Sequence, residues 1–376
     1  MCGSAAASNA NPSDHAASWA NLSTAEAAHQ YDAFTSLPVC ESDHRDSSAS
    51  SVIDFHANVA NAFGSQAPTV ELRYLEHFVA VAFPGASSSR LELITSILAL
   101  ISLLKDHPRD QKVRMARAIR QAVNRARLSS PNSSGPATGM NLQAGQADPF
   151  ANVSAAMGQG MAGYLQQLCQ PMIDRLIVEN PRRTEQLFLA LENWWAVKGT
   201  RAPASFNNVD DLVAYRVQDF GAEFWSAAIV FALDLDILAG AVTDQATTTI
   251  TRHAWISAAS SFDYFSYKSK NMSVFNAVAI LNSSIPPYSI QNSGKPAVKQ
   301  RIATAENDLT RGIAKFRSDF REDIDAPHAP TVALESYLEG VQYFAAGYHC
   351  AMGLMHGSDN VYKTGDGLVN PYNALG

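Results

Sequence analysis

The sequence predicts an all-α protein, and three observations support this fold class. From about Val70 onward, apolar residues recur mostly at helical spacing, while the alternation typical of strands is scarce. Clusters of Pro, Gly, Ser and Asn separate the helical segments, as expected of turns and helix ends. Hydrophobic residues make up 47% of the 376 positions and charged residues 17%, which is enough apolar material for one large core.

Helical segments alternate with short breaks along most of the chain. The apolar run ITSILALISLL, residues 94–104, contains hydroxyl side chains and is too short to span a bilayer, so it predicts a buried helix. The expected helices are 70–82, 88–105, 110–127, 150–178, 182–197, 208–232, 241–268, 272–282, 296–323 and 331–355.

The two ends and one internal segment differ in composition from the helical part. Residues 1–30 are rich in Ala, Ser and Asn and lack the basic start and apolar stretch of a signal peptide, so they predict a disordered segment. Residues 128–149 are polar and rich in Gly and Pro, which predicts a long loop. The helices on both sides of this loop look equally amphipathic. We therefore expect one α domain over 31–355, with a C-terminal tail over 356–376.

Net charge and cysteine content limit which binding partners and which cell compartment are expected. A net charge of −7 argues against a nucleic-acid partner, since phosphate contacts need clustered cations. The four cysteines are scattered without C-x-x-C spacing, which predicts reduced thiols in a cytoplasmic protein with no membrane span. One stretch, 109–127, is strongly basic. It is interpreted either as a solvated helix face or as a contact to an anionic substrate.

Two acidic residues end the long apolar helix in the sequence LLKDHPRD. Asp106 and Asp110 are four residues apart, the spacing that places two carboxylates on one helix face, where they could hold Mg²⁺ against a diphosphate. Pro108 lies between them and disfavours helix at the residue before it. The helix is therefore expected to end near Asp106, which separates the pair.

A second stretch, DDLVAYRVQDFGAEFW, carries an arginine and an aspartate on one helix face. Arg216 can offer two parallel hydrogen bonds to a phosphate, and Asp219 follows three residues later. Such a pair is either structural or part of an anion site.

A third stretch, FDYFSYKSK, has Phe262, Ser266 and Lys270 at four-residue spacing. Asn, Ser and Glu at these positions would supply three oxygen ligands to a hard cation. This chain provides a ring, a hydroxyl and an ammonium group instead.

In order and spacing, these stretches resemble motifs of the class I terpene synthases, especially the cyclase domains of fungal chimeric cyclase–prenyltransferases. The resemblance runs from about Tyr31 to Leu354 and includes YDAFTSLPV, AFPGASSSRLELI, LVAYRVQDFGAEF, FDYFSYKSK and YLEGVQYFAAGYH. It implies an antiparallel helical bundle around an apolar central pocket. In that family, Mg²⁺ bound by two acidic motifs holds the diphosphate of an isoprenoid, and the carbocation formed by ionisation cyclises in a dry, aromatic pocket.

Carried over by position, the resemblance assigns catalytic roles to Asp106, Arg216 and Asp219. It assigns metal binding to Asp106, Asp110 and Ser266, the last from a motif that also retains Asp263. Substrate contacts are expected from the side chains of Arg216, Lys270, Phe83, Phe262, Tyr264 and Phe265, with Phe224 and Trp225 as further aromatic candidates.

The chain departs from the family pattern at several positions. His107 replaces the second aspartate of the first motif, Phe262 and Lys270 replace the outer ligands of the second, and no Arg-Tyr pair follows the last helix. Lys270 could pair directly with a diphosphate oxygen.

Three alternative functions are consistent with these residues. The first is a Mg²⁺-dependent cyclase of specialised metabolism acting on farnesyl or geranylgeranyl diphosphate. The second is a metal-independent enzyme that folds, cyclises or rearranges a preformed terpenoid or polyene. The third is a non-catalytic pseudoenzyme. The partner is an isoprenoid or terpenoid in the first two, and the oligomeric state stays open, a homodimer being one option.

Overall fold

The computed structural model describes residues 19–64, 72, 74–129, 150, 153, 158–198, 205–206, 208–237, 239–267, 275–283, 294–321 and 331–356. Its elements in chain order are β1 (Trp19–Leu22), α1 (Thr24–Tyr31), β2 (Val39–Ser42), α2 (Arg45–Phe63), α3 (Leu75–Ala82), α4 (Ser88–Leu103), α5 (Arg109–Ser129), α7 (Gln159–Glu179), α8 (Pro181–Val197), α9 (Val209–Asp219), α10 (Ala222–Ala232), α11 (Ala239–Thr243), α12 (Gln245–Ser266), α13 (Ala277–Ser283), α14 (Gly294–Arg321) and α15 (Thr331–His356).

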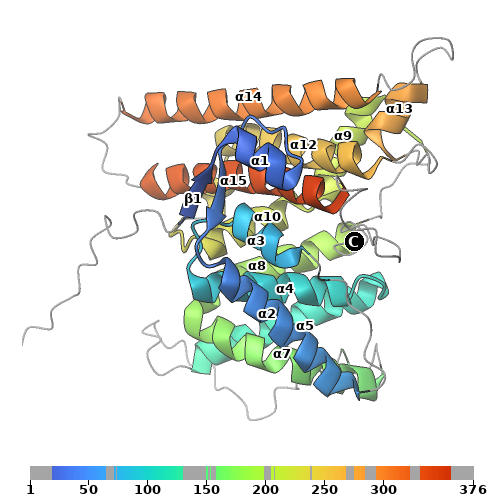
Figure 1. Ribbon diagram of the computed structural model, residues 1–376. Helices are drawn as coiled ribbons and strands as arrows, with labels where there is room; N and C mark the ends of the chain where they lie inside the picture. Colours follow the sequence, from blue (N-terminus) through green and yellow to red (C-terminus); the bar gives the residue numbers. More distant parts are fainter. Residues whose placement is uncertain are drawn as a thin grey trace, which may run out of the picture.

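The all-α prediction is confirmed. Most helices lie roughly side by side, with α14 along one edge of the bundle, α7 along the opposite edge, and α15, α10 and α4 between them (Figure 1). The closest packing joins α5 to α8, α12 to both α14 and α15, α15 to α3, and α2 to α4. Within the described part of the chain, sheet structure is confined to the antiparallel β1–β2 pair, with Trp19 opposite Ser42 and Leu22 opposite Val39.

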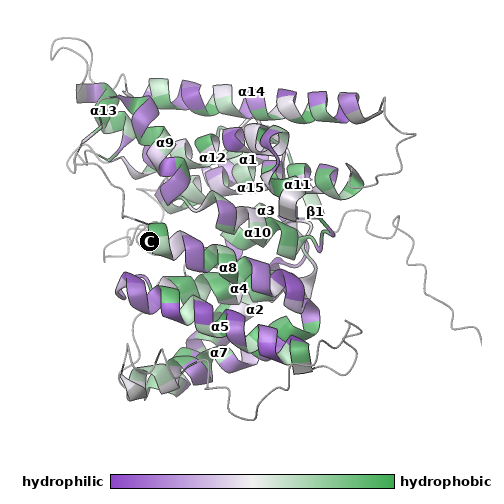
Figure 2. Cartoon of the chain, turned by 180° about the vertical axis from the view of Figure 1, so that it is seen from behind, coloured by the Kyte–Doolittle hydropathy of each residue, from purple (hydrophilic) through white to green (hydrophobic). Residues whose placement is uncertain are grey.

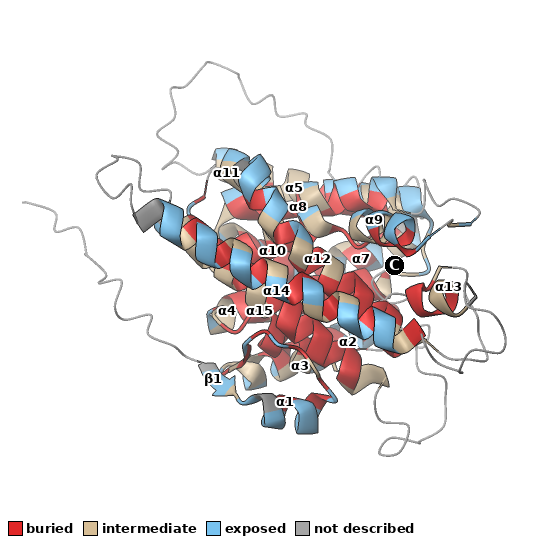
Figure 3. Ribbon diagram, turned by 90° about the horizontal axis from the view of Figure 1, so that it is seen from above, coloured by how far each residue is buried: buried red, intermediate tan, exposed pale blue. Residues whose placement is uncertain are grey.

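The core lies in the middle layers of the bundle. Helices α4 and α10 are largely hydrophobic, whereas α14 alternates between hydrophilic and hydrophobic residues (Figure 2). Viewed from above, α14 turns exposed residues outward and buried ones toward α12 and α15 (Figure 3). Its amphipathic sequence therefore covers the bundle, while the nearly continuous apolar sequence of α4 fills the interior.

Some expected helices are not continuous in the structure. The segment 150–178 is interrupted at Gly158, whose φ is +81°, and α7 begins only after it. The segment 208–232 forms α9 and α10 because Gly221 adopts a left-handed conformation with φ of +82°, which ends one helix and begins the next. The segment 241–268 contains a second start at α12, where the Asp244 carboxylate accepts a hydrogen bond of 2.9 Å from the Ala246 amide. Periodicity alone does not detect such breaks.

Part of the segment expected to be disordered is ordered. Residues 19–30 form β1 and most of α1, and α1 begins with a capping box in which Ser23 and Glu26 exchange hydrogen bonds. Tyr31 is buried, and its carbonyl lies directly against Gly353 of α15, where any larger side chain would collide. The prediction missed this helix because the Ala- and Ser-rich composition of the segment is also typical of disorder. Residues 1–18 lie outside the described part.

The other predicted loop regions fall largely outside the described residues. Helix α5 continues to Ser129 and α15 ends at His356, and 130–149 and 357–376 lie outside the described residues. Cys40, Cys169 and Cys350 are buried free thiols. Among the described helices, none combines the length and apolarity that crossing a bilayer requires.

Candidate functional site

The structure brings residues of the second and third sequence stretches together. Arg216, near the end of α9, places Nη2 3.4 Å from Oδ1 of Asp263 on α12. The same nitrogen donates to the carbonyl oxygen of Phe275, and the guanidinium carbon lies 5.4 Å from the centre of the Phe262 ring. The position of Phe262, where the family carries a metal ligand, thus holds a ring that faces a cation.

Asp263 is a carboxylate removed from water. Its side chain is 1% exposed, and Oδ2 accepts a hydrogen bond of 3.1 Å from the Ala277 amide. Burial raises the pKa of Asp263 to about 6, against the opposing effects of Arg216 and the Ala277 amide. The fully buried Tyr348 hydroxyl lies in the electrostatic range of both Arg216 and Asp263, and burial raises its pKa well above the usual value.

One side chain of α8, Trp194, contacts the break between α9 and α10 and holds it in place. Nε1 of Trp194 donates to the carbonyl oxygen of Asp219 at 2.8 Å, and the indole face covers Gly221 so closely that a Cβ there would lie 2.6 Å from the ring. The Tyr215 hydroxyl donates to Oδ1 of Asp219 at 3.4 Å. Asp219 is therefore held at the helix end by Trp194 and Tyr215.

An open pocket of about 370 Å³ adjoins this break. It combines the aromatic side chains of Trp194 and Tyr215 with the carboxylates of Asp219 and Glu223. The pocket is on the α8 side of the helix break.

Lys198, which was not among the predicted site residues, lies beside Trp194, and Lys112 is within its electrostatic range. Lys198 directly follows α8, and its Nζ is 4.6 Å from the centre of the Trp194 ring. Burial lowers the pKa of Lys198 to about 8; Asp219 opposes this shift, while Lys112 and Arg216 add to it. Lys112, in the first turn of α5, is buried and donates from Nζ to the carbonyl oxygen of Lys105 at 3.2 Å.

The carboxylates of the first acidic stretch lie on separate elements. Helix α4 ends at Leu103 and α5 begins at Arg109, so Asp106 is in the connecting turn and Asp110 in the first turn of α5. Both side chains are exposed. This agrees with the expected effect of Pro108. Burial lowers the pKa of the intervening His107, with Lys112 adding to the shift and Asp106 opposing it.

Apart from Phe262, the predicted aromatic residues occupy two different places. Phe83, Phe224 and Trp225 belong to a buried interior cluster, in which Trp225 lies 4.9 Å and Phe83 5.8 Å from the ring centre of Phe344. Tyr264 and Phe265 instead pack against Phe34 of the N-terminal segment, at 4.8 and 5.7 Å. Phe344 in turn lies 6.1 Å from the ring centre of Tyr348, so the first group belongs to the cluster that surrounds Tyr348.

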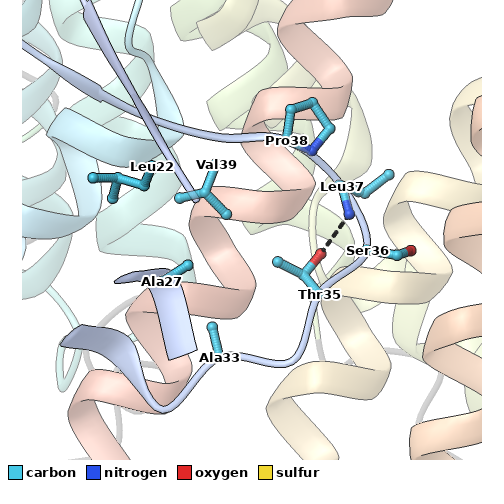
Figure 4. Close-up of a pocket in the computed structure, with 8 residues that line it drawn as sticks. All are labelled: Leu22, Ala27, Ala33, Thr35, Ser36, Leu37, Pro38 and Val39. Carbon is cyan, nitrogen blue, oxygen red and sulfur yellow. Dashed lines mark hydrogen bonds between the residues drawn. The ribbon is translucent and has the colours of Figure 1, made fainter. Parts of the chain in front are cut away.

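The N-terminal segment 33–38 is fixed to the bundle by two buried polar groups. The Glu306 carboxylate of α14 accepts hydrogen bonds of 2.7 Å from the Thr35 hydroxyl and from both the amide and the hydroxyl of Ser36. His349 of α15 accepts from the Phe34 amide at 3.2 Å. The described residues that line a pocket of about 270 Å³ at this segment all fall within 22–39, and Figure 4 shows the Leu37 amide donating to the Thr35 hydroxyl there.

The donor set does not fit the Mg²⁺ cluster that the resemblance implies. Asp263 is already engaged by Arg216 and the Ala277 amide, and Ser266 has its hydroxyl 3.5 Å from the Asn276 amide nitrogen. Within the described ranges, no three His, Cys, Asp or Glu side chains converge as metal ligands. Lys270, the remaining predicted residue of this stretch, lies outside the described residues.

Comparison with solved structures supports the fold. No protein-family model and no curated protein matches the sequence. A mutant of the SVS_A2 protein from ancestral sequence reconstruction aligns with a TM-score of 0.55 at 16% identity, covering 86% of this chain and 88% of that chain. The SVS_A2 protein itself aligns with a TM-score of 0.52 at 16% identity, covering 86% and 89%. The chain has the class I terpene synthase fold. Germacradien-4-ol synthase from Streptomyces citricolor aligns more weakly, with a TM-score of 0.48 at 14% identity, covering 83% and 95%.

Proposed function

We propose that this protein is a terpene cyclase, similar to the fungal enzymes of specialised metabolism, that converts farnesyl or geranylgeranyl diphosphate into a cyclic product. The observation that carries the proposal is the position of Arg216. Its side chain is 13% exposed, and the guanidinium lies over Phe262, next to the buried Asp263 and within electrostatic range of Tyr348 in the aromatic cluster. A planar donor fork in this place suits a phosphate head whose apolar tail enters the bundle.

In this proposal Arg216 receives the diphosphate in exchange for its contact with Asp263. The bond between the allylic carbon and oxygen breaks with both electrons on the diphosphate, and the carbocation closes a ring and loses a proton. Trp225, Phe344 and Tyr348 offer ring faces to that cation. Their centres are 4.9 to 6.1 Å apart, so we expect these rings to separate when a substrate enters.

Mg²⁺, where bound, would neutralise the leaving group. The described residues do not supply a fitting set of ligands for it.

One observation favours a second function, the acid-initiated rearrangement of a preformed terpenoid. Asp263 is buried beside the interior, and its pKa of about 6 keeps part of the carboxyl protonated near neutral pH. The Asp263 carboxyl would donate its proton to an alkene carbon, and the carboxylate would accept a proton when the resulting cation forms a new double bond. No diphosphate leaves in this reaction.

Product analysis separates the two functions. The intact protein is incubated with C10 to C25 prenyl diphosphates and with the corresponding non-phosphorylated terpenoids, each with Mg²⁺ and with EDTA. The proposed cyclase forms cyclic products from a diphosphate, and Arg216→Met abolishes them while Arg311→Met, an exposed arginine of α14, does not. Products from non-phosphorylated substrates alone, lost in Asp263→Asn, would establish the second function and overturn the first.

A further inference from the structure

Two buried tyrosines of α15 differ in their hydrogen bonds. Tyr337 is 0% and Tyr348 1% exposed, and they are about three helical turns apart, so both face the same side of α15. The Tyr337 hydroxyl donates to Oγ of Ser226 on α10 at 2.9 Å. The Tyr348 hydroxyl has no hydrogen-bond partner among the described residues. Because buried tyrosine hydroxyls are normally paired, the Tyr348 hydroxyl points to a ligand.

The ring of Tyr348 is enclosed by other aromatic rings. Its centre lies 5.1 Å from that of Phe220 and 5.9 Å from that of Phe78, both edge to face, and 6.1 Å from that of Phe344. A ring packed in this way has little freedom to turn its hydroxyl toward another group of the protein. The hydroxyl is therefore a fixed polar group within the aromatic cluster that offers its ring faces to the proposed cation.

One face of α9 connects Tyr348 with Arg216 and Asp263. Arg216 and Phe220 are four residues apart, and the Phe220 amide donates to the Arg216 carbonyl oxygen at 2.7 Å, so the two side chains share a helix face. Arg216 lies 3.4 Å from Oδ1 of Asp263, and the Phe220 ring contacts Tyr348. Like the Tyr348 hydroxyl, Oδ1 of Asp263 is buried and receives no hydrogen bond from the described residues. Two such oxygen atoms therefore flank one turn of α9.

The ligand follows from what a buried hydroxyl can bind. A phenol hydroxyl both donates and accepts, and burial raises the pKa of Tyr348 well above its usual value, so the hydroxyl keeps its proton. The hydrocarbon tail of a prenyl diphosphate has no polar atom to pair with it. A water molecule can donate and accept, and it is small enough to lie beside that tail.

We propose that the Tyr348 hydroxyl holds a water molecule that captures the final carbocation, so that the product is a terpene alcohol. This inference deepens the proposed cyclase function and rests on it. The water oxygen donates an electron pair to the cationic carbon and forms the new carbon–oxygen bond. The resulting oxonium passes one proton to the carboxylate of Asp263, which the exchange with diphosphate has released from Arg216. Water and the cation supply all the atoms and electrons of this step.

Products formed in ¹⁸O-labelled water test the assignment. The full chain is incubated with farnesyl and geranylgeranyl diphosphate in labelled water, with Mg²⁺ and with EDTA, and the products are analysed by mass spectrometry. The wild type is expected to form an alcohol that carries the label. Tyr348→Phe is expected to lower the ratio of alcohol to hydrocarbon at least about tenfold, because the water loses its hydrogen bond. Tyr337→Phe is the matched control and should keep the wild-type ratio.

Thermal unfolding tests the unpaired hydroxyl without turnover. Tyr337→Phe removes a paired hydroxyl and is expected to lower the midpoint of unfolding, whereas Tyr348→Phe should lower it by less. An equal or larger loss in Tyr348→Phe would show that the protein itself pairs this hydroxyl and would overturn the water site.

The remaining outcomes separate the water site from the cyclase. Hydrocarbons alone, an alcohol without the label, or a wild-type product ratio in Tyr348→Phe overturns the water site and leaves the cyclase standing. No release of diphosphate from either substrate under both conditions defeats the proposed cyclase, and the water site with it.

Discussion

At the scale of single residues, the end of α9 depends on Gly221 and Trp194. The φ of +82° is unfavourable for a residue with a side chain, and the indole of Trp194 fills the space where a Cβ would lie. This contact also fixes the Asp219 carbonyl through the Trp194 Nε1 hydrogen bond. The geometry around Arg216 is therefore coupled to a side chain of α8.

Gly221→Ala is expected to lower the free energy of unfolding by at least about 2 kcal/mol, from backbone strain and the clash with Trp194. Gly163→Ala is the control, since Gly163 lies in α7 with no atom near its Cβ position and should gain up to about 1 kcal/mol. Urea unfolding measures both. Equal stability of Gly221→Ala and wild type would show that the break is not held in this way.

His349 is a neutral buried histidine whose tautomer follows from its partners. The Phe34 amide can only donate, so Nε2 accepts and the ring proton lies on Nδ1, which donates to the Ser261 hydroxyl at 2.7 Å. Ser261 in turn donates to the Ser257 carbonyl oxygen at 2.9 Å. Burial, with a smaller effect of Lys299, lowers the pKa of His349 to about 3.

Because the pKa of His349 is depressed in the folded protein, this histidine adds to the free energy of unfolding in a pH-dependent way. Its contribution is complete above about pH 6.5 and is lost as the pH falls toward 3, because the unfolded chain binds the proton more readily. The raised pKa of Asp263 acts in the opposite direction between pH 6 and the unfolded value of 3.8, where falling pH stabilises the fold.

Comparing wild type with His349→Gln isolates the histidine. The stability advantage of the wild type should shrink by about 1.4 kcal/mol per pH unit between pH 6 and 4. Denaturant unfolding at four pH values measures this difference. Parallel curves for the two proteins would contradict the assignment of a neutral His349.

At the scale of elements, the N-terminal segment 33–38 depends strongly on Glu306, a side chain far away in the sequence. Glu306 of α14 accepts four hydrogen bonds, the fourth from the Ser257 hydroxyl at 3.3 Å. The segment places Phe34 against Tyr264 and Phe265 at the end of α12. The carboxylate thus ties the N-terminal segment to the helix that carries Asp263.

Glu306→Gln is expected to lower the free energy of unfolding by about 2 kcal/mol or more, since one of its two acceptor oxygens is replaced by a donor facing buried donors. Asp319→Asn, an exposed change on the same helix, should cost less than about 0.5 kcal/mol. Urea unfolding and limited proteolysis within residues 33–38 measure the effect. Equal stability and equal protease resistance of the two variants would contradict the role of Glu306.

Helix periodicity predicted most elements from α3 onward because buried stripes repeat regularly along them. It did not predict α2, whose apolar residues are interspersed with Ser, Asn and Asp, or α1, which depends on a cap and on contact with Gly353. The division into α9 and α10 depends on one backbone angle at Gly221, which spacing does not encode.

At the scale of the whole molecule, the sequence pointed to one stretch with Arg216 and Asp219 and to another that retains Asp263, and the fold brings Arg216 within 3.4 Å of Asp263. The sequence could not identify Lys198, because its place beside Trp194 and Asp219 depends on how the end of α8 packs against the end of α9. Nor could it show that Tyr264 and Phe265 face the N-terminal segment. Spacing indicates which residues share a helix face, but packing decides what that face meets.

The most direct test of the central claim is release of diphosphate from geranylgeranyl or farnesyl diphosphate by the purified protein, measured with Mg²⁺ and with EDTA. Wild type is expected to release diphosphate under at least one condition, and Arg216→Met to be at least about 100-fold slower, as when a positioned donor to developing negative charge is removed. Arg311→Met should match the wild type. No release by the wild type, or equal release by Arg216→Met, would contradict a diphosphate-ionising site built around Arg216.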